Sequence, residues 1–441
     1  MPNPVYPTPP IARTAAFLAR LVQRLPIGTN LALAHLLFTL LAGHLLGSRG
    51  ALFPALSAAG LDPQQTCRAV AALREGTWSI PPLLERLHHL ITKEKQAPPV
   101  RIGTWQPLLL DWVGFFRPRL TDCTSKHFDS RAGKALPAIE IGMMARLLHV
   151  GKRTFPCLIA LVRHGDTLAL LQMARARQAS EDVLVVDRQV KIGHLQAAGI
   201  THFVVRGALN LAAYRKDPPP QPASKRGRKP TRGERVRPVA RRYKGKLLPV
   251  TAPDRVECFV HQGRTLTCQR FDGLVVAGCP FVFGIVVIFD PRYKNPWLLV
   301  SDLHEESAEV VFLLYRSRWP IEVIPLTGKQ LLGGQRSFVH AAPCRYRLPE
   351  LCLLAASVSL YLSATCAAVP SGFWDRNPQP TAGRFRRVLA GARLPEFGAI
   401  CALEGRVRPK RSVHEHLSKG VEANRRYRGQ RALPILTGKT S

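Results

Sequence analysis

The residues of this sequence that are best suited to chemistry lie between positions 307 and 333. Tyr315, Arg318, Glu322 and Lys329 follow one another at offsets of 0, 3, 7 and 14 residues. A helix turns about 100° per residue, so this spacing places all four side chains on one narrow stripe. A carboxylate there can bind a metal ion, while arginine, lysine and tyrosine donate hydrogen bonds to phosphate oxygens. The pattern therefore indicates an active-site wall or, alternatively, a solvated helix face with an ordinary charge pair.

Two prolines interrupt the same stretch. Pro320 and Pro325 each lack a backbone N–H and clash with the preceding turn of a helix. We therefore expect the helix to be kinked or restarted at Pro320.

Two aspartates that follow apolar runs complete a set of three acids. Pro107-Leu-Leu-Leu leads to Asp111, and Val183-Leu-Val-Val leads to Asp187. A continuous apolar run bounded by polar residues is typical of a strand buried on both faces, and side chains at strand ends project where adjacent loops form a cleft. We expect both aspartates at such ends, although each alone would more often be a cap or turn residue. Together with Glu322 they form a candidate catalytic set.

These residues resemble the catalytic residues of DDE transposases encoded by bacterial insertion sequences. The spacing of the tyrosine, arginine, glutamate and lysine is that of the YREK signature of this family. The pair Arg318-Trp319 ahead of the glutamate, and the sequence HLQAAGITHFVVRGALN after the second aspartate, are also similar to the family. The resemblance covers about residues 107–368, and we call residues 307–333 the signature segment.

The resemblance implies a role for each of these side chains. Asp111, Asp187 and Glu322 would be the catalytic residues and would bind Mg²⁺ or Mn²⁺, in a site for two ions. Such ions prefer carboxylate oxygens, and two of them about 4 Å apart can activate a water or a 3′-hydroxyl while stabilising the leaving oxygen. The other three signature residues would bind the phosphates of DNA: Tyr315, Arg318 and Lys329.

The sequence departs from the family pattern around both aspartates. Gln189-Val190 stands where the family often has Gly-Phe after the second acid. The first acid often belongs to an Asp-x-Thr sequence, which Asp111-Trp-Val lacks and Asp122-Cys-Thr has. We prefer Asp111, because its apolar approach predicts a buried strand, and keep Asp122 as the alternative.

The overall charge points to a polyanionic partner. Sixty-three Lys and Arg against twenty-nine Asp and Glu give a net charge of +34, which nucleic acid would neutralise most simply. This charge argues against a glycoside hydrolase, which needs two carboxylates beside a sugar ring. The ten cysteines form no CxxC pair and are interpreted as small buried residues in a reducing cytoplasm.

The fold class that we predict is α/β. An all-α N-terminal region would precede an RNase H-like mixed sheet that carries an inserted β-rich subdomain. The predicted parts follow in chain order. A helical, DNA-end-binding region (residues 1–100) precedes the first half of the core (101–215). A basic linker with the β-insertion (216–300), the second half of the core with the signature segment (301–370) and a basic tail (371–441) come after it.

The predicted linker is the most basic part of the insertion. Residues 224–246 contain eleven Lys or Arg and one acid, so we expect an extended, solvated segment attracted to phosphates. Arg226, Arg228 and Lys229 resemble the core of an AT-hook, except that a lysine precedes the proline, and they are predicted DNA contacts. The HQGR sequence that follows predicts the turn of a β-hairpin.

Two long apolar stretches raise the question of a membrane. Residues 31–47 carry no formal charge but contain His, Thr and Gly, and residues 347–365 are interrupted by Ser and Cys. We interpret both as buried helices rather than membrane spans.

The sequence thus predicts a bacterial DDE transposase that cuts DNA at transposon ends and joins them to target DNA. Its partners would be double-stranded DNA and, by analogy, a second subunit in a homodimer on DNA. It would act in the cytoplasm at the nucleoid and not in a membrane. The alternative is a catalytically inactive DNA-binding protein that retains the transposase fold, and a membrane protein ranks third.

Overall fold

The computed structural model describes residues 9–398 except for 27, 94–96, 118–119, 121–122, 152, 219–230, 337–338 and 340. Within these residues the chain forms two compact units. Unit 1 comprises Met1–Gln96, Gly114–Ile139 and Ile324–Ser441, and unit 2 comprises Ala97–Val113 and Glu140–Val323. The chain therefore passes from one unit to the other after Gln96, within two strands after Val113 and Ile139, and after Val323, one residue beyond the signature glutamate.

Unit 1 begins with the predicted helical region. Its helices are α1 (Pro10–Val22), α2 (Thr29–Leu41), α3 (His44–Gly47), α4 (Leu52–Ala58), α5 (Pro63–Glu75) and α6 (Ile80–Lys93). Helix α2 is apolar on all sides and, apart from Leu31, entirely buried, as expected for a core helix. Helix α5 begins at a capping box, in which Asp62 accepts from the Gln65 backbone and the Gln65 side chain accepts from the Asp62 backbone.

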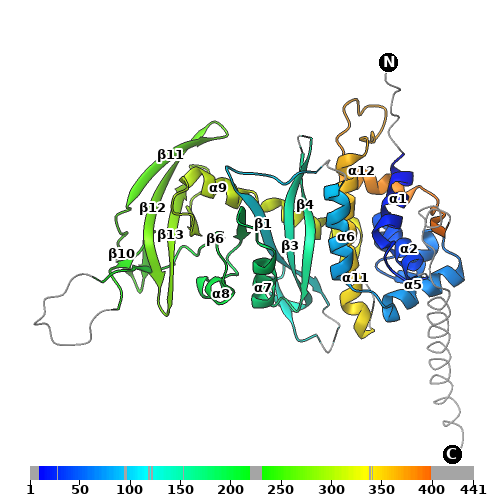
Figure 1. Cartoon of the computed structure of the whole chain (residues 1–441), viewed down its shortest axis with the longest axis horizontal. Helices are drawn as coiled ribbons and strands as arrows, with labels where there is room; N and C mark the ends of the chain where they lie inside the picture. Colours follow the sequence, from blue (N-terminus) through cyan, green and yellow to red (C-terminus); the bar gives the residue numbers. More distant parts are fainter. Residues whose placement is uncertain are drawn as a thin grey trace, which may run out of the picture. The chain divides into compact units, whose positions relative to one another are not determined.

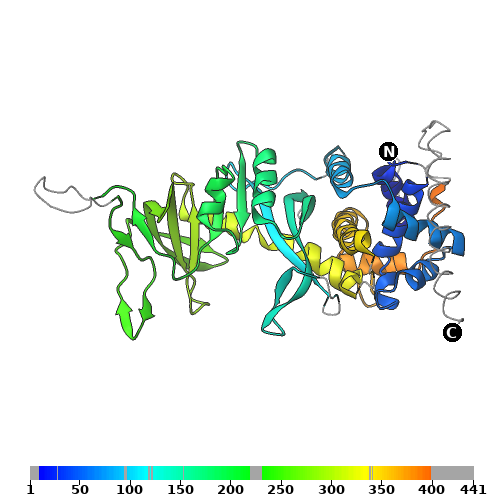
Figure 2. The ribbon, with the colours of Figure 1, turned by 90° about the horizontal axis from the view of Figure 1, so that it is seen from below.

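The centre of unit 1 is α11 (Ala342–Thr365), which packs against α2, α5, α6 and α12 (Ala382–Ala390). Figure 2 shows α11, in yellow, beside the blue N-terminal helices and the orange α12. By length and composition α11 could cross a membrane. However, 83% of its most apolar 18-residue stretch is buried, as in the core helix of a soluble protein. Unit 1 also contains the short elements α10 (Val323–Leu326), η2 (Thr327–Leu331) and η3 (Gly334–Arg336), and the hairpin of β2 (Lys126–Asp129) with the start of β3.

Unit 2 is built on a mixed sheet with the order β3-β1-β5-β6-β14-β13-β12-β7-β8, in which β4 pairs with β3 and β11 with β12. The first strands along the chain are β1 (Gln106–Phe116), β3 (Lys134–Val150), β4 (Arg153–Arg163), β5 (Asp182–Val186) and β6 (Phe203–Arg206). Strands β1, β5 and β6 run parallel, and α7 (Thr167–Arg177) and α8 (Ile192–Ala197) lie between them in sequence. The predicted α/β class with a large mixed sheet and a helical N-terminal region is therefore confirmed.

The predicted β-insertion consists of long antiparallel strands. These are β11 (Arg255–His261), β12 (Arg264–Val276) and β13 (Cys279–Phe289), which lie side by side in Figure 1, followed by β14 (Trp297–Ser301). Gln262 and Gly263 connect β11 to β12 with φ values of 52° and 73°. Two positive φ angles are what a tight two-residue hairpin turn requires, so the hairpin predicted at HQGR is confirmed.

The basic linker is more structured than we predicted. It contains β8 (Arg235–Val236), which pairs with β7 (Ala213–Arg215), and a small hairpin of β9 (Arg241–Tyr243) and β10 (Lys246–Leu248). Backbone pairing with β7 and within the hairpin satisfies polar groups that an extended segment would leave to water. The predicted DNA contacts Arg226, Arg228 and Lys229 lie outside the described residues.

One further prediction needs correction. Among the described cysteines six are buried, but Cys67 and Cys258 are exposed, because they lie on the outer faces of α5 and β11. The predicted basic tail contains α12, which buries Phe385 and Leu389 within unit 1. Residues 399–441 of that tail lie outside the described part of the chain.

Candidate active site

One arginine gathers the three predicted catalytic acids. The guanidinium of Arg318 lies 3.8 Å from Asp111, 3.7 Å from Asp187 and 2.6 Å from Glu322, measured between nitrogen and carboxylate oxygen. Its side chain is only 5% exposed, whereas the three carboxylates are 22%, 44% and 40% exposed. The site is thus a buried cation with three acids around it that water can reach. All of these residues belong to unit 2.

The parallel pairing of β1 with β5 places the two aspartates side by side. The strands pair in register from Gln106 with Asp182 to Leu109 with Val185. The same offset relates Asp111 to Asp187, which follows β5 directly. The expected position of the second aspartate at a strand end is confirmed.

The expected position of Asp111 at a strand end is wrong. Strand β1 continues through Asp111 to Phe116, because its other neighbour in the sheet, β3, is 17 residues long and extends alongside. Asp111 is therefore held by strand backbone on both sides, and one of its oxygens accepts a hydrogen bond of 2.9 Å from the Trp112 N–H. A carboxylate inside a strand has less freedom than one on a loop.

The signature segment is divided into several short helices. Helix α9 (Ala308–Arg316) begins at Ser307, whose hydroxyl accepts from the Val310 N–H, and a 3-10 turn, η1 (Trp319–Glu322), follows it. The predicted break at Pro320 is confirmed. Arg318 and Glu322 still meet across the break.

Tyr315 completes the group on the side of Asp187. Its hydroxyl donates a hydrogen bond of 3.2 Å to that carboxylate, and its ring lies 5.9 Å from the Arg318 guanidinium carbon. Burial, together with the negative charge of Asp187, raises the pKa of the Tyr315 hydroxyl above its ordinary value. Tyr315 is therefore a hydrogen-bond donor in this site.

Lys329 lies beyond the break in the signature segment. The residue lies in η2, a turn of π-helix within unit 1, and its ammonium is 5.3 Å and 5.8 Å from the ring centroids of Phe115 and Phe116. The change from α to 3-10 and π geometry alters the rotation per residue, so the four signature residues do not lie on one continuous α-helix. The predicted position of Lys329 beside the acids stays a prediction. The alternative first acid, Asp122, lies outside the described residues.

The three acids are not equivalent electrostatically. Burial raises the pKa of Asp111 from its ordinary value of 3.8 to about 6, although the nearby charge of Arg318 and the Trp112 N–H both act in the opposite direction. For Arg318, burial alone would lower the pKa, but the negative charges of Asp111, Asp187 and Glu322 outweigh it and raise the pKa. Arg318 is therefore charged at all ordinary pH values, and burial makes Asp111 harder to ionise than an exposed carboxyl.

Sequence reasoning missed two arginines that support the site. Arg206, at the end of β6, lies with its guanidinium carbon 5.0 Å from the Trp297 ring centroid and 5.8 Å from that of Tyr315. Arg270, on β12, donates to backbone carbonyls in the loop 303–306 that leads into α9. The position of Arg206 after the apolar run FVV resembles that of the aspartates and is a signal that could have been used.

The donor set is of the type that binds hard divalent ions. Asp111, Asp187 and Glu322 supply carboxylate oxygens at one point of unit 2, and the Nε of Arg318 is buried without a hydrogen-bond partner. Among the described residues no three His, Cys, Asp or Glu side chains already form a cluster that would enclose an ion. In this arrangement the arginine provides the positive charge that the acids require.

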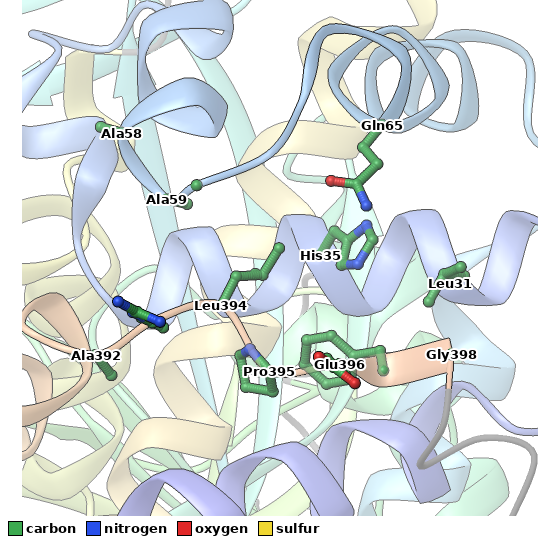
Figure 3. Close-up of a pocket in the computed structure, with 13 residues that line it drawn as sticks. Leu31, His35, Ala58, Ala59, Gln65, Ala392, Leu394, Pro395, Glu396 and Gly398 are labelled. Atoms are coloured by element: carbon green, nitrogen blue, oxygen red, sulfur yellow. The ribbon is translucent and has the colours of Figure 1, made fainter.

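A cavity of about 790 Å³ in unit 1 is separate from these residues. Figure 3 shows His35 and Gln65 on one side and Leu394 to Gly398 on the other. Burial lowers the pKa of His35, so its imidazole is neutral at pH 7. None of the predicted site residues lines this cavity.

The chain matches no known protein-family model, and no curated protein matches its sequence.

Proposed function

We propose that this protein is a DNA transposase of the DDE type, with an RNase H-like core, that cleaves DNA at transposon ends and transfers the strands to target DNA. The observation that carries the proposal is the meeting of Asp111, Asp187 and Glu322 around Arg318, from two strands and a helical segment that are far apart in sequence. The net charge of +34 supports DNA as the substrate.

Each side chain has a part in this chemistry. Asp111, Asp187 and Glu322 would hold Mg²⁺ or Mn²⁺, which when bound supplies a Lewis acid for phosphoryl transfer. Arg318 would bind a phosphate oxygen of the transposon end and oppose the repulsion among the carboxylates. Tyr315 would fix the Asp187 carboxylate through its hydrogen bond, and Lys329 and the linker arginines would bind DNA outside the carboxylate group. Double-stranded DNA and a second subunit are the proposed partners, at the bacterial nucleoid.

The test is nicking of labelled DNA that carries the flanking terminal repeats, with Mg²⁺ or Mn²⁺. We expect Asp111→Ala, Asp187→Ala and Glu322→Ala each to lower the rate by about 1000-fold or more, because each removes an acid of the metal site. Glu309→Ala is the matched control, since Glu309 is an exposed acid of α9 that makes no ion pair with Arg318.

Asp122→Ala separates the two candidates for the first acid. Retention of nicking in this variant, with loss in Asp111→Ala, supports Asp111. The reverse result would move the first ligand to Asp122 and leave the proposed reaction intact.

One observation favours a second candidate, a DNA-binding protein of this fold that does not cut. The 2.6 Å contact between Arg318 and Glu322 occupies an oxygen of the third acid with a guanidinium. Such a protein would bind the same DNA and would fail to nick it with either metal. Tight binding of wild type to the repeat ends without nicking would decide for this candidate.

A further inference from the structure

Two aromatic side chains stand out from the surface of unit 1 between α11 and α12. Phe373 is 95% exposed and Trp374 is 68% exposed, although both are large apolar residues. Their ring centroids are 5.1 Å apart with an angle of 79° between the planes. We call residues 372–375 the aromatic turn. Exposed neighbouring aromatics of this kind usually mark a binding surface.

The aromatic turn is held by polar contacts below the rings. The Asp375 N–H donates to the Gly372 carbonyl at 3.1 Å, which closes the turn, and the Asp375 carboxylate accepts from the Ser371 N–H at 2.9 Å. The Trp374 ring lies over Gly372, since a Cβ atom built there would be 2.4 Å from the ring. The two rings are thus presented by a fixed backbone.

Helix α12 anchors the aromatic turn through two arginines. Arg384 forms an ion pair of 2.8 Å with Asp375, and Arg387 donates to the Ser371 hydroxyl at 3.2 Å. The Arg384 side chain is 21% exposed and that of Asp375 is 14% exposed, so the pair is largely shielded from water. Arg376, next to the rings in sequence, is exposed.

The sequence from residue 371 to residue 441 is rich in basic residues as a whole. Residues 371–441 contain fifteen Lys or Arg and five Asp or Glu. Guanidinium groups bind phosphates, while aromatic rings stack on bases of any sequence. The exposed Arg376 beside two exposed rings therefore matches a ligand with negative charges and flat apolar faces.

We propose that the aromatic turn binds DNA by stacking Phe373 and Trp374 on unpaired or unstacked bases, while the arginines beside it bind the adjoining phosphates. The site is in unit 1 and is distinct from the carboxylates of unit 2. The inference rests on the proposed function for the identity of the nucleic acid. A membrane surface is the competing partner for exposed aromatics near arginine, but two rings bury little area in a bilayer, and the charge of the chain suits DNA.

The experiment measures binding of the full-length protein to a fluorescein-labelled single strand of mixed sequence and to its duplex, without divalent ions, over a series of salt concentrations. The double variant Phe373→Ala/Trp374→Ala should bind the single strand about 10-fold more weakly or worse, because each lost stack weakens binding severalfold. The slope of log Kd against log salt should not change, since the phosphate contacts remain. Trp374→Phe should retain most of the affinity, because phenylalanine also stacks.

Phe128→Ala is the matched control, since Phe128 is a 62% exposed aromatic on β2 of the same unit. It should bind DNA like wild type. If the double variant also binds like wild type, the proposal is overturned. The proposal is also overturned if the slope of log Kd against log salt falls together with the affinity. A parallel measurement uses phosphatidylserine vesicles, and loss of vesicle binding alone in the double variant would overturn the proposal as well.

The nicking assay separates this proposal from the proposed function. Suppose that the wild type never nicks DNA and that the double variant loses binding to the single strand. This result would support DNA binding by the aromatic turn and count against the transposase. Normal nicking by wild type with unchanged strand binding by the double variant would support the transposase and overturn the aromatic turn as a DNA-binding site.

Discussion

Two buried arginines in unit 2 are surrounded by acids, yet they are bonded differently. Arg270 has a side chain that is 4% exposed, and its Nε donates to Asp272 at 3.0 Å while its terminal nitrogens donate to the carbonyls of Leu303, His304 and Glu306. Arg318 is 5% exposed, its closest partners are carboxylates, and its Nε has no hydrogen-bond partner.

The difference distinguishes a structural clamp from a candidate site. Arg270 is fully satisfied by fixed backbone oxygens, so any ligand would have to compete with the fold. Arg318 leaves a donor unused and holds acids that are partly exposed, one of which has a raised pKa. Incomplete satisfaction of a buried polar group is unusual in a purely structural contact. The proposed chemistry at Arg318 is consistent with this difference.

The largest expected effect in this comparison concerns stability. Arg270→Ala should lower the free energy of unfolding by about 3 kcal/mol or more, because it leaves three backbone carbonyls and one oxygen of Asp272 without this donor, while Arg255 still donates to the other Asp272 oxygen. Arg318→Ala should cost about 1 to 2 kcal/mol, since its acids can be hydrated. Urea unfolding of wild type and both variants, with and without Mg²⁺, measures these two losses of unfolding free energy.

Magnesium sharpens the same contrast. We expect Mg²⁺ to restore stability to Arg318→Ala, where it replaces the lost positive charge, and not to Arg270→Ala. Equal recovery of both variants, or of neither, would remove the distinction between clamp and site.

The next effect is a pH dependence that comes from Asp111. The carboxyl has a pKa of about 6 in the folded chain against an ordinary 3.8, so the folded state binds this proton more tightly than the unfolded state does. The stabilisation is complete below pH 4 and is lost as the pH rises to about 6, by about 3 kcal/mol. The difference in unfolding free energy between wild type and Asp111→Asn should therefore grow over this range, with the variant more stable at pH 7. A difference that stays constant with pH would show that Asp111 is not buried in this way.

The smallest expected effect is that of the Tyr315 hydroxyl. Tyr315→Phe removes one hydrogen bond to a partly exposed carboxylate, so the unfolding free energy should fall by about 1 kcal/mol or less. Nicking should fall by about 10-fold, because Asp187 loses the group that orients it. The control is Trp297→Phe, which keeps the hydrogen bond from Tyr315 to Asp187. The Trp297 ring contacts the Tyr315 ring edge-on, with 5.7 Å between the ring centroids. A loss in Trp297→Phe as large as in Tyr315→Phe would assign the effect to packing.

The sequence predicted local features better than distant contacts. The apolar run before Asp187, the turn at Gln262-Gly263 and the break at Pro320 each depend on a few neighbouring residues, and the structure has all three. The position of Asp111 inside β1 depends on β3, which follows later in the chain, and could not be read from the run before it. The catalytic role of the three acids stays a prediction.

The contacts of the arginines were least accessible to sequence reasoning. Arg270 meets backbone atoms more than thirty residues away, and Lys329 lies in a π-helical turn that no residue type announces. The aromatic turn was missed for another reason. Phe373 and Trp374 look like core residues in a sequence, and only their exposure reveals them.

The register of β1 on β5 also limits how this gene can change. Side chains alternate between the two faces of a strand, so deletion or insertion of one codon between positions 106 and 111 would turn Asp111 to the opposite face of the sheet. Substitutions among Leu108, Leu109 and Leu110 would keep the carboxylate in place. Insertions and deletions of single residues should therefore be absent from functional homologues in this short interval, while apolar exchanges accumulate there.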